Sequence, residues 1–561
     1  FPDFRKKLSF WELYWKLGTR IKKKIEFWDT EIGRIVSTVF VRKIRTRKST
    51  CFQIGNKINR QFVLVEHVGG SSDPDEIKLL HQKALAECER LKLEIRPTLF
   101  PLTEEREVAK LVNWRITGFH QVFGSVYDLI GFPSNHLRDL AIARIAYPRS
   151  KLATARYLEQ YLGISLSEDK IYRFLDTLNK DELTKIAFNF VKKKNGNNMA
   201  LVFYDVTTLY FEVNDEDDLR KKGYSKDHKN DLPQIVIGLF VDKDGYPFDF
   251  DFYDGKTFEG HTFSKAVGSL VKKYQLNHLV VVADAGMLSE QNINFLETMK
   301  LSYIVGARLK GMSEKFKAQI FSHNFVKDSI YEISTIPYNT TNPNTKRLII
   351  DYSDKRARKD KLNREKLIKI LEAKIASKKP LTKRSKYLLV TGNDQILGIN
   401  QVKINLDQRH DGLKGYWTNL KTEIKPDQII DQYHSLWKVE KAFRMSKSDL
   451  LERPIFHRKK ERIAGHLLIC FSSLLVMKET ERLLKEINIS LNHAIELLGK
   501  IGQGEMRLGK ITMPIDSDLN SETNQILNHI LGHWIAEVGT LALAIYFAGT
   551  SIPTLYNNLS T

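Results

Sequence analysis

Two short apolar runs, each followed by an aspartate, constrain the fold more than any other feature of the sequence. Residues 201–204 are Leu, Val, Phe and Tyr and lead into Asp205, and the apolar residues 279–283 lead into Asp284. Continuous apolar runs of this length are typical of strands that are buried on both faces of a sheet. Each strand therefore carries its carboxylate to the rim of a sheet, where a site can be built.

The order of the elements predicted around these runs indicates an α/β fold. Strands are predicted over residues 234–242 and 247–252, joined by the turn DKDG, and together with the first run they form an antiparallel meander. A helix over 263–274, the strand ending at Asp284, a helix over 289–299 and a strand over 303–306 follow. This order is that of the RNase H-like mixed sheet flanked by helices. The first and fourth strands of that fold are central neighbours, so Asp205 and Asp284 can converge.

A third acid, Glu440, lies on a predicted amphipathic helix over residues 431–451. At about 100° per residue, Tyr433, Leu436, Glu440, Arg444 and Lys447 fall within one narrow face of this helix. A neighbouring apolar stripe, which would pack on the sheet, is formed by Val439, Phe443 and Leu450. Alternating charges on a helix are usually a solvated surface. The aromatic and apolar flanks, together with the two earlier aspartates, favour a functional face here.

The charge balance points to a polyanionic partner. The 561 residues include 88 Lys and Arg against 67 Asp and Glu, a formal net charge of +21. Nucleic acid comes before a membrane because no lipid-binding or lipidation signal accompanies this surplus. Residues 355–386 hold 14 Lys and Arg against three acids, and we favour phosphate contact over a solvated helix there. The basic extension over residues 1–40 is either a DNA-contacting arm or a segment without function.

Cysteine usage and hydropathy indicate the cellular compartment of the protein. Three widely spaced cysteines, Cys51, Cys88 and Cys470, exclude a disulfide framework and a Cys-type zinc site and fit a reducing cytosol. The longest apolar runs, 466–477 and 538–547, fall short of the roughly 18 residues that a membrane-spanning helix needs. We therefore expect two core helices and a cytoplasmic protein without a membrane partner.

The predicted elements divide the rest of the chain into further segments. A small α/β module spans 41–110, with a hairpin over 50–66 and a helix over 74–93. A helical region spans 111–195. Within it, helices over 151–162 and 167–178 flank Gly163 and form either a helix-turn-helix for DNA or an ordinary helical pair. The core covers 196–309 and 411–480, a basic β-rich insertion covers 310–410, and a helical C-terminal region covers 481–561.

The segment YHSLWKVEKAFRMSK resembles the C-terminal signature of DDE transposases of the IS-four-like insertion-sequence group. That signature is Tyr, two residues, Arg, three residues, Glu, six residues, Lys; Tyr433, Glu440 and Lys447 match it, and Leu436 stands in place of the arginine. FYDVTTLYFE and the ADAG of residues 283–286 resemble the first and second catalytic regions of this group, and residues 453–471 resemble it as well. The resemblance covers most of the chain from about residue 41.

The resemblance implies a transposase of a bacterial insertion sequence. Such an enzyme binds the terminal inverted repeats as double-stranded DNA, cleaves the ends and joins the released 3′-OH to target DNA. It implies Asp205, Asp284 and Glu440 as catalytic, metal-binding residues, with Asp205 bridging two Mg²⁺ ions and the other two acids holding one each. Mn²⁺ would substitute. Carboxylate oxygens suit these ions, and two such ions supply a nucleophile, leaving-group stabilisation and charge neutralisation.

The resemblance also assigns cations and partners. Tyr433 and Lys447 would contact DNA phosphates. Because Arg444 lies on the same predicted helix face as Glu440, one turn after it, our own hypothesis is that Arg444 replaces the arginine missing at Leu436. A homodimer on DNA is implied because two transposon ends must be paired, and the nucleoid would be its location. Two alternatives stay open: an RNase H-like nuclease without strand transfer, and a catalytically inactive or domesticated sequence-specific DNA-binding protein.

Overall fold

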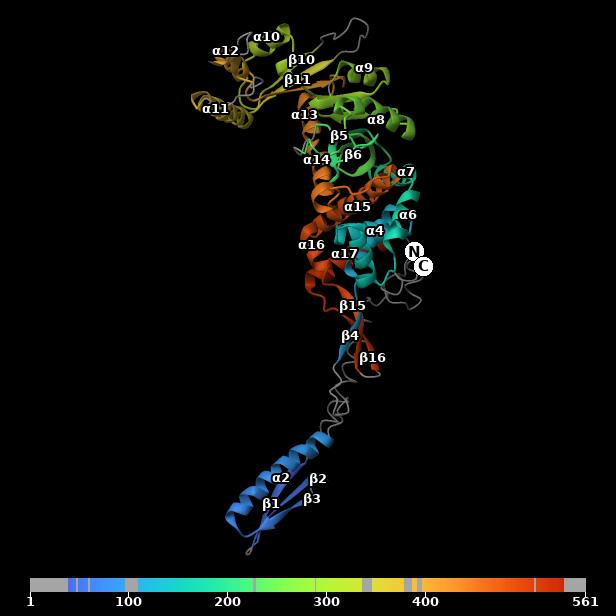
Figure 1. Ribbon diagram of the computed structural model, residues 1–561, viewed down its shortest axis with the longest axis vertical. Coiled ribbons are helices and arrows are strands. Elements are labelled where there is room, and N and C mark those ends of the chain that lie inside the picture. The colour runs from blue at the N-terminus through green and yellow to red at the C-terminus, as the bar shows by residue number, and fades with distance from the viewer. Residues whose placement is uncertain are drawn as a thin grey trace, which may run out of the picture. The chain divides into compact units, whose positions relative to one another are not determined.

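The computed structural model describes most of the chain, in two compact units that meet at residues 109 and 110 in sequence (Figure 1). The described residues are 39–46, 49–58, 61–95, 109–224, 229–287, 289–334, 346–377, 386–390, 396–508 and 511–538. Each unit is described by itself below. The predicted extension over residues 1–40 lies outside these ranges except for its last two residues.

The N-terminal unit is a three-stranded antiparallel sheet with a helix on one face. Its strands follow the order β1-β2-β3 and span β1 Phe40–Arg45, β2 Thr50–Ile58 and β3 Gln61–Ser71. Helix α2, Pro74–Ile95, packs on β2 and β3. The small core includes Phe52, Ile54 and Cys88, all buried. The hairpin and the helix that the sequence predicts in this module are confirmed.

The second unit is built on an eight-stranded mixed sheet in the order β10-β11-β14-β9-β8-β5-β6-β7. Strands β5, β8 and β9 run parallel to one another, and all other neighbours are antiparallel. The strands span β5 Leu201–Tyr210, β6 Gln234–Asp242, β7 Pro247–Asp254, β8 Val280–Ala283, β9 Ser302–Ala307, β10 Ile330–Ser334, β11 Arg347–Tyr352 and β14 Leu413–Thr418. The predicted mixed α/β sheet with the RNase H-like strand order is confirmed.

Two features of this sheet differ from the sequence prediction. Strand β5 continues through Asp205 to Tyr210, so this acid lies within the strand rather than at its end. The continuation follows from the buried residues Val206 to Leu209, which pair with β6 along their whole length. Strands β10 and β11 come from the segment assigned to an insertion, yet they extend the core sheet. Strand β11 is buried at Leu348, Ile349 and Ile350 and therefore needs neighbours on both sides.

Helices cover both faces of the sheet. Those that follow the strands of the core are α8 Glu259–Tyr274, α9 Glu290–Thr298, α13 Pro426–His434 and α14 Trp437–Arg444. The rest of the segment 310–410 holds more helix than its β-rich prediction: α10 Glu314–Ser322, α11 Asp354–Ala376 and α12 Gln401–Gln408, beside the short pair β12 Leu388–Val390 and β13 Ile396–Ile399. Small separate apolar clusters support these elements.

A helical bundle packs around the long helix α15, Lys460–Glu486. Its other members are α3 Gly118–Ile130, α4 His136–Ala146, α5 Lys151–Tyr157, α6 Glu168–Thr177, α7 Lys180–Lys194, α16 Leu491–Leu498 and α17 Ser521–Val538. By length and composition α15 could cross a membrane, with mean hydropathy 1.3, but 89% of its apolar window is buried inside the protein. The core helix predicted over 466–477 is thus present. Residues 539–547 of the second predicted core helix lie outside the described ranges.

The bundle also contains a small sheet that the sequence prediction missed. Strand β4, Lys110–Ile116, opens the region predicted to be helical, and it pairs with β15, Gly502–Leu508, which pairs in turn with β16, Ile511–Asp516. A Cβ atom at Gly502 would lie 2.4 Å from the Trp114 ring, so the close approach of β15 to β4 requires glycine there. The helical predictions for 111–195 and 481–561 were therefore wrong at these strands.

The predicted pair of helices around Gly163 is present. Helix α5 runs into the π-helical turn η1, Leu158–Leu162, and Gly163 ends it with φ of 68°. Ser167 then caps α6 by accepting a hydrogen bond from the Lys170 amide. The inner face of α6 buries Ile171 and Leu175 against α15. Contact of this pair with DNA stays a prediction.

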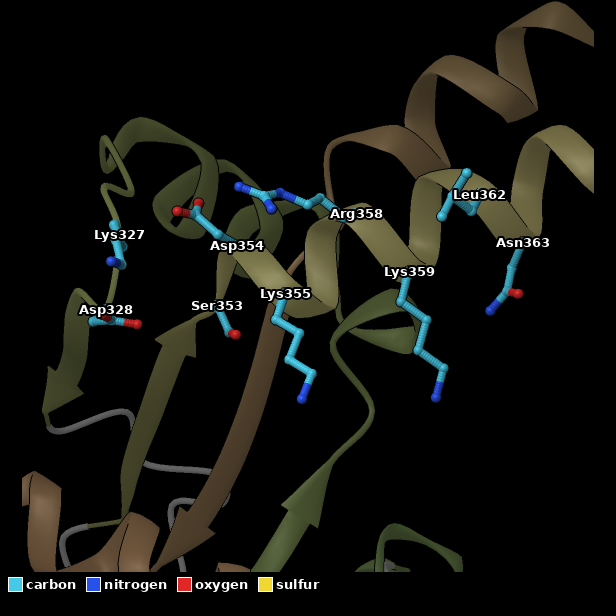
Figure 2. A pocket seen from close by; sticks show the side chains of 9 residues that line it. All are labelled: Lys327, Asp328, Ser353, Asp354, Lys355, Arg358, Lys359, Leu362 and Asn363. Atoms are coloured by element: carbon cyan, nitrogen blue, oxygen red, sulfur yellow. The ribbon is translucent and has the colours of Figure 1, made fainter.

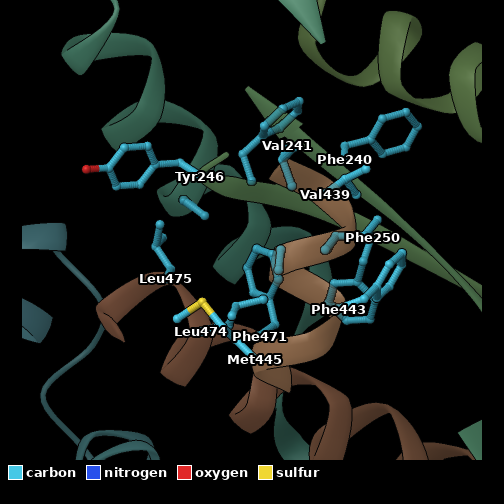
Figure 3. Packing of buried hydrophobic residues seen from close by; sticks show 14 of the residues in the cluster. Phe240, Val241, Tyr246, Phe250, Val439, Phe443, Met445, Phe471, Leu474 and Leu475 are labelled. Carbon is cyan, nitrogen blue, oxygen red and sulfur yellow. The ribbon is translucent and has the colours of Figure 1, made fainter. Parts of the chain in front are cut away.

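Helix α14 is anchored on the sheet by a dense aromatic cluster (Figure 3). Val439 and Phe443 of α14 point toward β6 and β7, and residues of α15 close the cluster from the other side. The rings of Phe250 and Phe471 lie 5.2 Å apart, which joins β7 to α15 directly. The predicted apolar stripe of Val439, Phe443 and Leu450 is buried. This anchor fixes the position of Glu440, on the same helix.

Candidate active site

Asp205 and Asp284 follow the last residue pair that the neighbouring strands β5 and β8 form with each other. Strands β5 and β8 are parallel neighbours, and their last registered pair is Tyr204 with Ala283. Asp205 is the next residue of β5, which continues beyond it, and Asp284 is the first residue after β8. Since neighbouring strands lie about 4.8 Å apart, the two carboxylates lie close together where β8 ends. Asp205 is half-buried and Asp284 is exposed, so the pair lies at the surface.

Tyr433 joins this pair from helix α13. Its phenol donates a hydrogen bond of 2.9 Å to Oδ1 of Asp284. Burial, followed by the charges of Asp284 and Asp205, raises the pKa of Tyr433 well above its ordinary value, so the phenol stays protonated and remains a donor. Gly306 on β9 leaves the room for it, because a Cβ atom there would lie 2.5 Å from the phenol oxygen.

Lys447, the last residue of the signature segment, contacts strand β5 beside Asp205. Its ammonium donates to Oγ1 of Thr207 at 2.6 Å. Thr207 lies two residues beyond Asp205 on β5, and residues two apart on a strand point to the same face. Lys447 therefore places a positive charge on the Asp205 side of the sheet.

Glu440 approaches from α14, which packs on β5 and β6. Its neighbours Val439 and Phe443 are buried while Glu440 itself is exposed. In the described parts of the chain, no group of three or more His, Cys, Asp or Glu side chains is placed to hold a metal ion. The structure thus brings Asp205 and Asp284 together, and Glu440 does not complete a compact three-acid cluster with them.

The signature segment is not the single helix that the sequence predicts. Helix α13 ends at His434, α14 begins at Trp437, and the segment Met445–Asp449 forms a π-helical turn. The predicted common face is therefore broken: Tyr433 and Leu436 are buried, whereas Glu440 and Arg444 are exposed. The break arises where Leu436 enters the main apolar core between the two helices.

Lys414 on β14 is a site residue that sequence reasoning missed. Its ammonium lies 4.6 Å from the centre of the Tyr433 ring. Burial, together with Arg356, lowers the pKa of Lys414, while the charges of Asp351, Asp284 and Glu440 act in the opposite direction. Lys414 is thus within electrostatic reach of two of the three predicted catalytic acids. A lone lysine inside an otherwise apolar strand was the available signal.

A polar network holds β14 and β11 together behind Lys414. Tyr416 donates a 2.9 Å hydrogen bond to Asp351, and Arg356 forms an ion pair with the same carboxylate at 3.1 Å. Arg356 also donates to the carbonyl of Gly412 at 3.0 Å. The ring of Tyr416 meets that of Tyr433 edge to face with centroids 4.7 Å apart. The network therefore positions both Lys414 and Tyr433.

A basic hollow of about 550 Å³ lies at the start of α11 (Figure 2). Its charged lining consists of four cations, Lys327, Lys355, Arg358 and Lys359, and two acids, Asp328 and Asp354. Only two residues of α11, Arg364 and Leu371, are buried. The basic helix predicted over residues 355–386 is confirmed over its first two thirds, and most of its cations face solvent.

Residues 198–476 match the family model described as the transposase DDE domain. This part of the chain is a transposase DDE domain. The match spans the whole mixed sheet and includes Asp205, Asp284 and Glu440, together with Tyr433 and Lys447. Members of this family are enzymes that cleave DNA and transfer its strands. A search for curated relatives of the sequence finds no match.

Two solved transposase structures are similar to parts of the chain. One is the piggyBac transposase synaptic complex with hairpin DNA, with 10% identity over 80% of this chain and 84% of that chain and a TM-score of 0.34. The other is the Mos1 transposase paired-end complex with the left transposon end, with 13% identity over 39% of this chain and 66% of that chain and a TM-score of 0.14. Both scores are low, so the family assignment rests on residues 198–476.

Proposed function

We propose that the protein is the transposase of a bacterial insertion sequence. It binds the terminal inverted repeats of its element as double-stranded DNA, cleaves the ends and joins the 3′-OH to target DNA. The single observation that carries this proposal is the convergence of Asp205 and Asp284 at the end of the β5–β8 pairing, inside a DDE domain. Its place of action is the nucleoid of the cytoplasm.

Divalent metal is part of the proposal. Asp205, Asp284 and Glu440 would hold two Mg²⁺ ions, and Mn²⁺ would substitute. Their carboxylate oxygens are the donors that such hard cations prefer. When bound, two ions neutralise charge at the scissile phosphate and activate the attacking oxygen. Glu440, on α14, would supply a further carboxylate ligand.

The side chains around the acids orient a carboxylate and supply positive charge for the phosphates of DNA. Tyr433 fixes one oxygen of Asp284 through its hydrogen bond and thereby orients the carboxylate. Lys447, held at Thr207, and Lys414, held over Tyr433, supply positive charge on two sides of the acids. Both would contact phosphates of the bound DNA end. Arg444, exposed on α14, would supply the contact that Leu436 cannot make.

The basic hollow at α11 supports contact with a DNA backbone away from the acids (Figure 2). Four cations against two acids around one cavity favour a polyanion over an apolar or basic partner. Two copies of the chain would act together, because an insertion sequence has two ends to be joined.

Cleavage of end-containing DNA tests the proposal. The full chain, incubated with duplex carrying the flanks of its own coding sequence, should nick that DNA with Mg²⁺ or Mn²⁺ and not with EDTA. Asp205→Asn, Asp284→Asn and Glu440→Gln should each abolish nicking, whereas Asp215→Asn, an exposed loop acid, should not. Nicking that survives Asp284→Asn would refute the assignment.

A DNA-binding protein without catalysis is the second candidate. It is favoured by the lack of a three-acid cluster among the described residues. It predicts that the same DNA is bound with equal affinity with and without metal, and that no 3′-OH is released. The nuclease alternative predicts nicking without any joined product, so one gel with a target plasmid separates all three.

A further inference from the structure

The N-terminal unit divides its charge unevenly between sheet and helix. Residues 40–71 include seven Lys and Arg and a single acid, Glu66, whereas α2 holds four Lys and Arg against five acids. A positive surplus concentrated in one stretch of the sequence is an electrostatic footprint for a polyanion, and Arg42, Lys43, Arg45 and Lys57 of this stretch lie on β1 and β2. Neither the family match, which begins at residue 198, nor the proposed chemistry uses this unit.

Helix α2 covers only one face of the sheet. Val41 is registered opposite Ile54, and both belong to the small core with Cys88 of α2. Arg42 is registered opposite Gln53, so these two side chains point to the other face. We call this second surface the open face. Glu66 is registered opposite Ile54 and belongs to the helix side.

The open face carries two aromatic rings flanked by two cations. The Phe62 ring lies over Gly55, where a Cβ atom would sit 2.5 Å from it, and it meets Phe40 at 5.7 Å. The Arg42 guanidinium stands 4.7 Å from the centre of the Phe62 ring. The Lys57 ammonium stands 6.0 Å from that of Phe40. Stacking on a ring orients a guanidinium while its N–H groups remain available to a ligand.

Hydrogen-bonding groups lie beside these cations. Gln53 is within 3.5 Å of Nδ1 of His67 on the neighbouring strand, and both are accessible to solvent. Arginine and glutamine are the side chains that bond guanine and adenine edges in a bidentate manner. The open face therefore offers both cations that can contact DNA phosphates and side chains that can bond base edges.

The dimensions fit a duplex. The major groove of B-DNA is about 12 Å wide and admits a two-stranded β-ribbon, and Arg42 and Lys57 lie on the neighbouring strands β1 and β2, about 4.8 Å apart. The major groove of RNA is deep and narrow and excludes such a sheet. Residues 1–38 do not neutralise the positive charge of residues 40–71, because they are basic themselves, with nine Lys and Arg against five acids.

We propose that the open face of the N-terminal sheet is a duplex DNA-binding surface, separate from the DDE domain, that enters the major groove with Arg42 and Lys57. Sheets and β-ribbons read this groove in known DNA-binding modules. The inference rests on the proposed function for its ligand, since a transposase must recognise its own ends. It places recognition of DNA on a unit that takes no part in cleavage.

The test compares two double variants of the full chain that change charge equally. Arg42→Gln with Lys57→Gln alters the open face; Lys78→Gln with Lys83→Gln alters exposed lysines of α2 and is the matched control. Binding is measured by fluorescence anisotropy on duplex DNA from the flanks of the coding sequence, across a range of salt concentrations. Thermal melts confirm that both variants are folded.

The open-face variant should bind at least about tenfold more weakly. The plot of log K against log salt should become less steep by about 0.9 for each of the two cations that contacts a phosphate rather than a base edge. The control should change neither quantity by a comparable amount. Equal losses in both variants, no loss in the open-face variant, or tighter binding of duplex RNA than of DNA would overturn the inference.

Nicking measured at saturating DNA separates this inference from the proposed function. If the open-face variant binds weakly but nicks at the wild-type rate once saturated, both proposals stand. If the wild type never nicks while the open-face variant still loses DNA binding, the proposed chemistry fails and the binding surface stands. If nicking is normal and binding is unchanged in the variant, the surface fails alone.

Discussion

The phenol of Tyr433 donates a 2.9 Å hydrogen bond to the carboxylate of Asp284. This bond joins the first residue of the signature segment to the second aspartate, 149 positions away in the chain. It gives Tyr433 a place at the acids themselves, in addition to the phosphate contact that the family resemblance implies. The predictions below follow from this arrangement.

Removing the phenol alone should impair cleavage and leave the fold intact. Tyr433→Phe keeps the ring between Tyr416 and Lys414 but loses the bond to Asp284. A hydrogen bond to a charged group contributes about 1.5–3 kcal/mol, so the nicking rate should fall about tenfold or more. Rates at several Mn²⁺ concentrations, beside a thermal melt, measure this. An unchanged rate would mean that the bond does not orient Asp284 for reaction.

A methyl group at residue 306 should act on the same bond from the other side. In Gly306→Ala the new Cβ would lie 2.5 Å from the phenol oxygen and 3.0 Å from the Ala285 amide. Overpacking of this kind costs about 1–3 kcal/mol, and Tyr433 must move away from Asp284. We expect lower stability in urea and slower nicking. Gly311→Ala, where no atom lies within 4 Å of the added carbon, should leave both unchanged.

The cations of the site should contribute to the rate of cleavage by acting on bound DNA and metal, and not by stabilising the fold. Lys447→Ala and Arg444→Ala should each slow end cleavage by about 10- to 100-fold, as expected for loss of a charged hydrogen bond to a phosphate. Single-turnover nicking at saturating DNA measures this effect. Lys438→Ala on the same helix is the control. A normal rate for Arg444→Ala would rule out its proposed replacement of the missing arginine.

Lys414→Met should separate stability from activity. Burial lowers the pKa of this lysine, which shows that its charge is costly to keep in the fold. Methionine of similar length should therefore preserve or raise the urea midpoint while it slows nicking. Equal nicking by the variant and the wild type would remove Lys414 from the site.

A pH-dependent stability is expected from Lys151, a buried residue of the helical bundle. Burial lowers its pKa to about 7, whereas in the unfolded chain it keeps its ordinary value of 10.5. Between these two values the unfolded chain binds more protons than the folded one, so stability should rise as the pH increases from about 7 to about 10. Urea midpoints at intervals across this range measure the rise. Lys151→Met should flatten it, and a rise that persists in that variant must come from other groups.

The fold could be predicted from sequence where patterns are local. Neighbouring residues alone determine three features: the apolar runs of β5 and β8, the hairpin of the N-terminal unit and the cap at Ser167. The pairing of β4 with β15 was missed because nearly 400 residues separate strands that show little apolar alternation. The role of β11 was missed for the same reason, since its neighbour β14 lies beyond α11.

The convergence of the two aspartates was predictable, and the side chains that support them were not. The apolar runs before Asp205 and Asp284 singled out these acids, and strand order explained why they converge. Tyr433 came from the family resemblance of the signature segment, and Glu440, taken from the same segment, does not join the two aspartates in a compact cluster. The helical wheel failed at Ser435 and Leu436 because a wheel assumes one unbroken helix. Lys414 was missed because its partners come from β8, α13 and α14, which only the folded chain assembles.

The central claim is that Asp205, Asp284 and Glu440 hold the metal that cleaves DNA. A crystal of the full chain with duplex from its own flanks, soaked in Mn²⁺, tests it through anomalous scattering. The account predicts Mn²⁺ peaks shared by Asp205 and Asp284, with Glu440 drawn in as a further ligand. Strong DNA density with no Mn²⁺ at these two aspartates, or with Glu440 remaining apart from a bound ion, would contradict it.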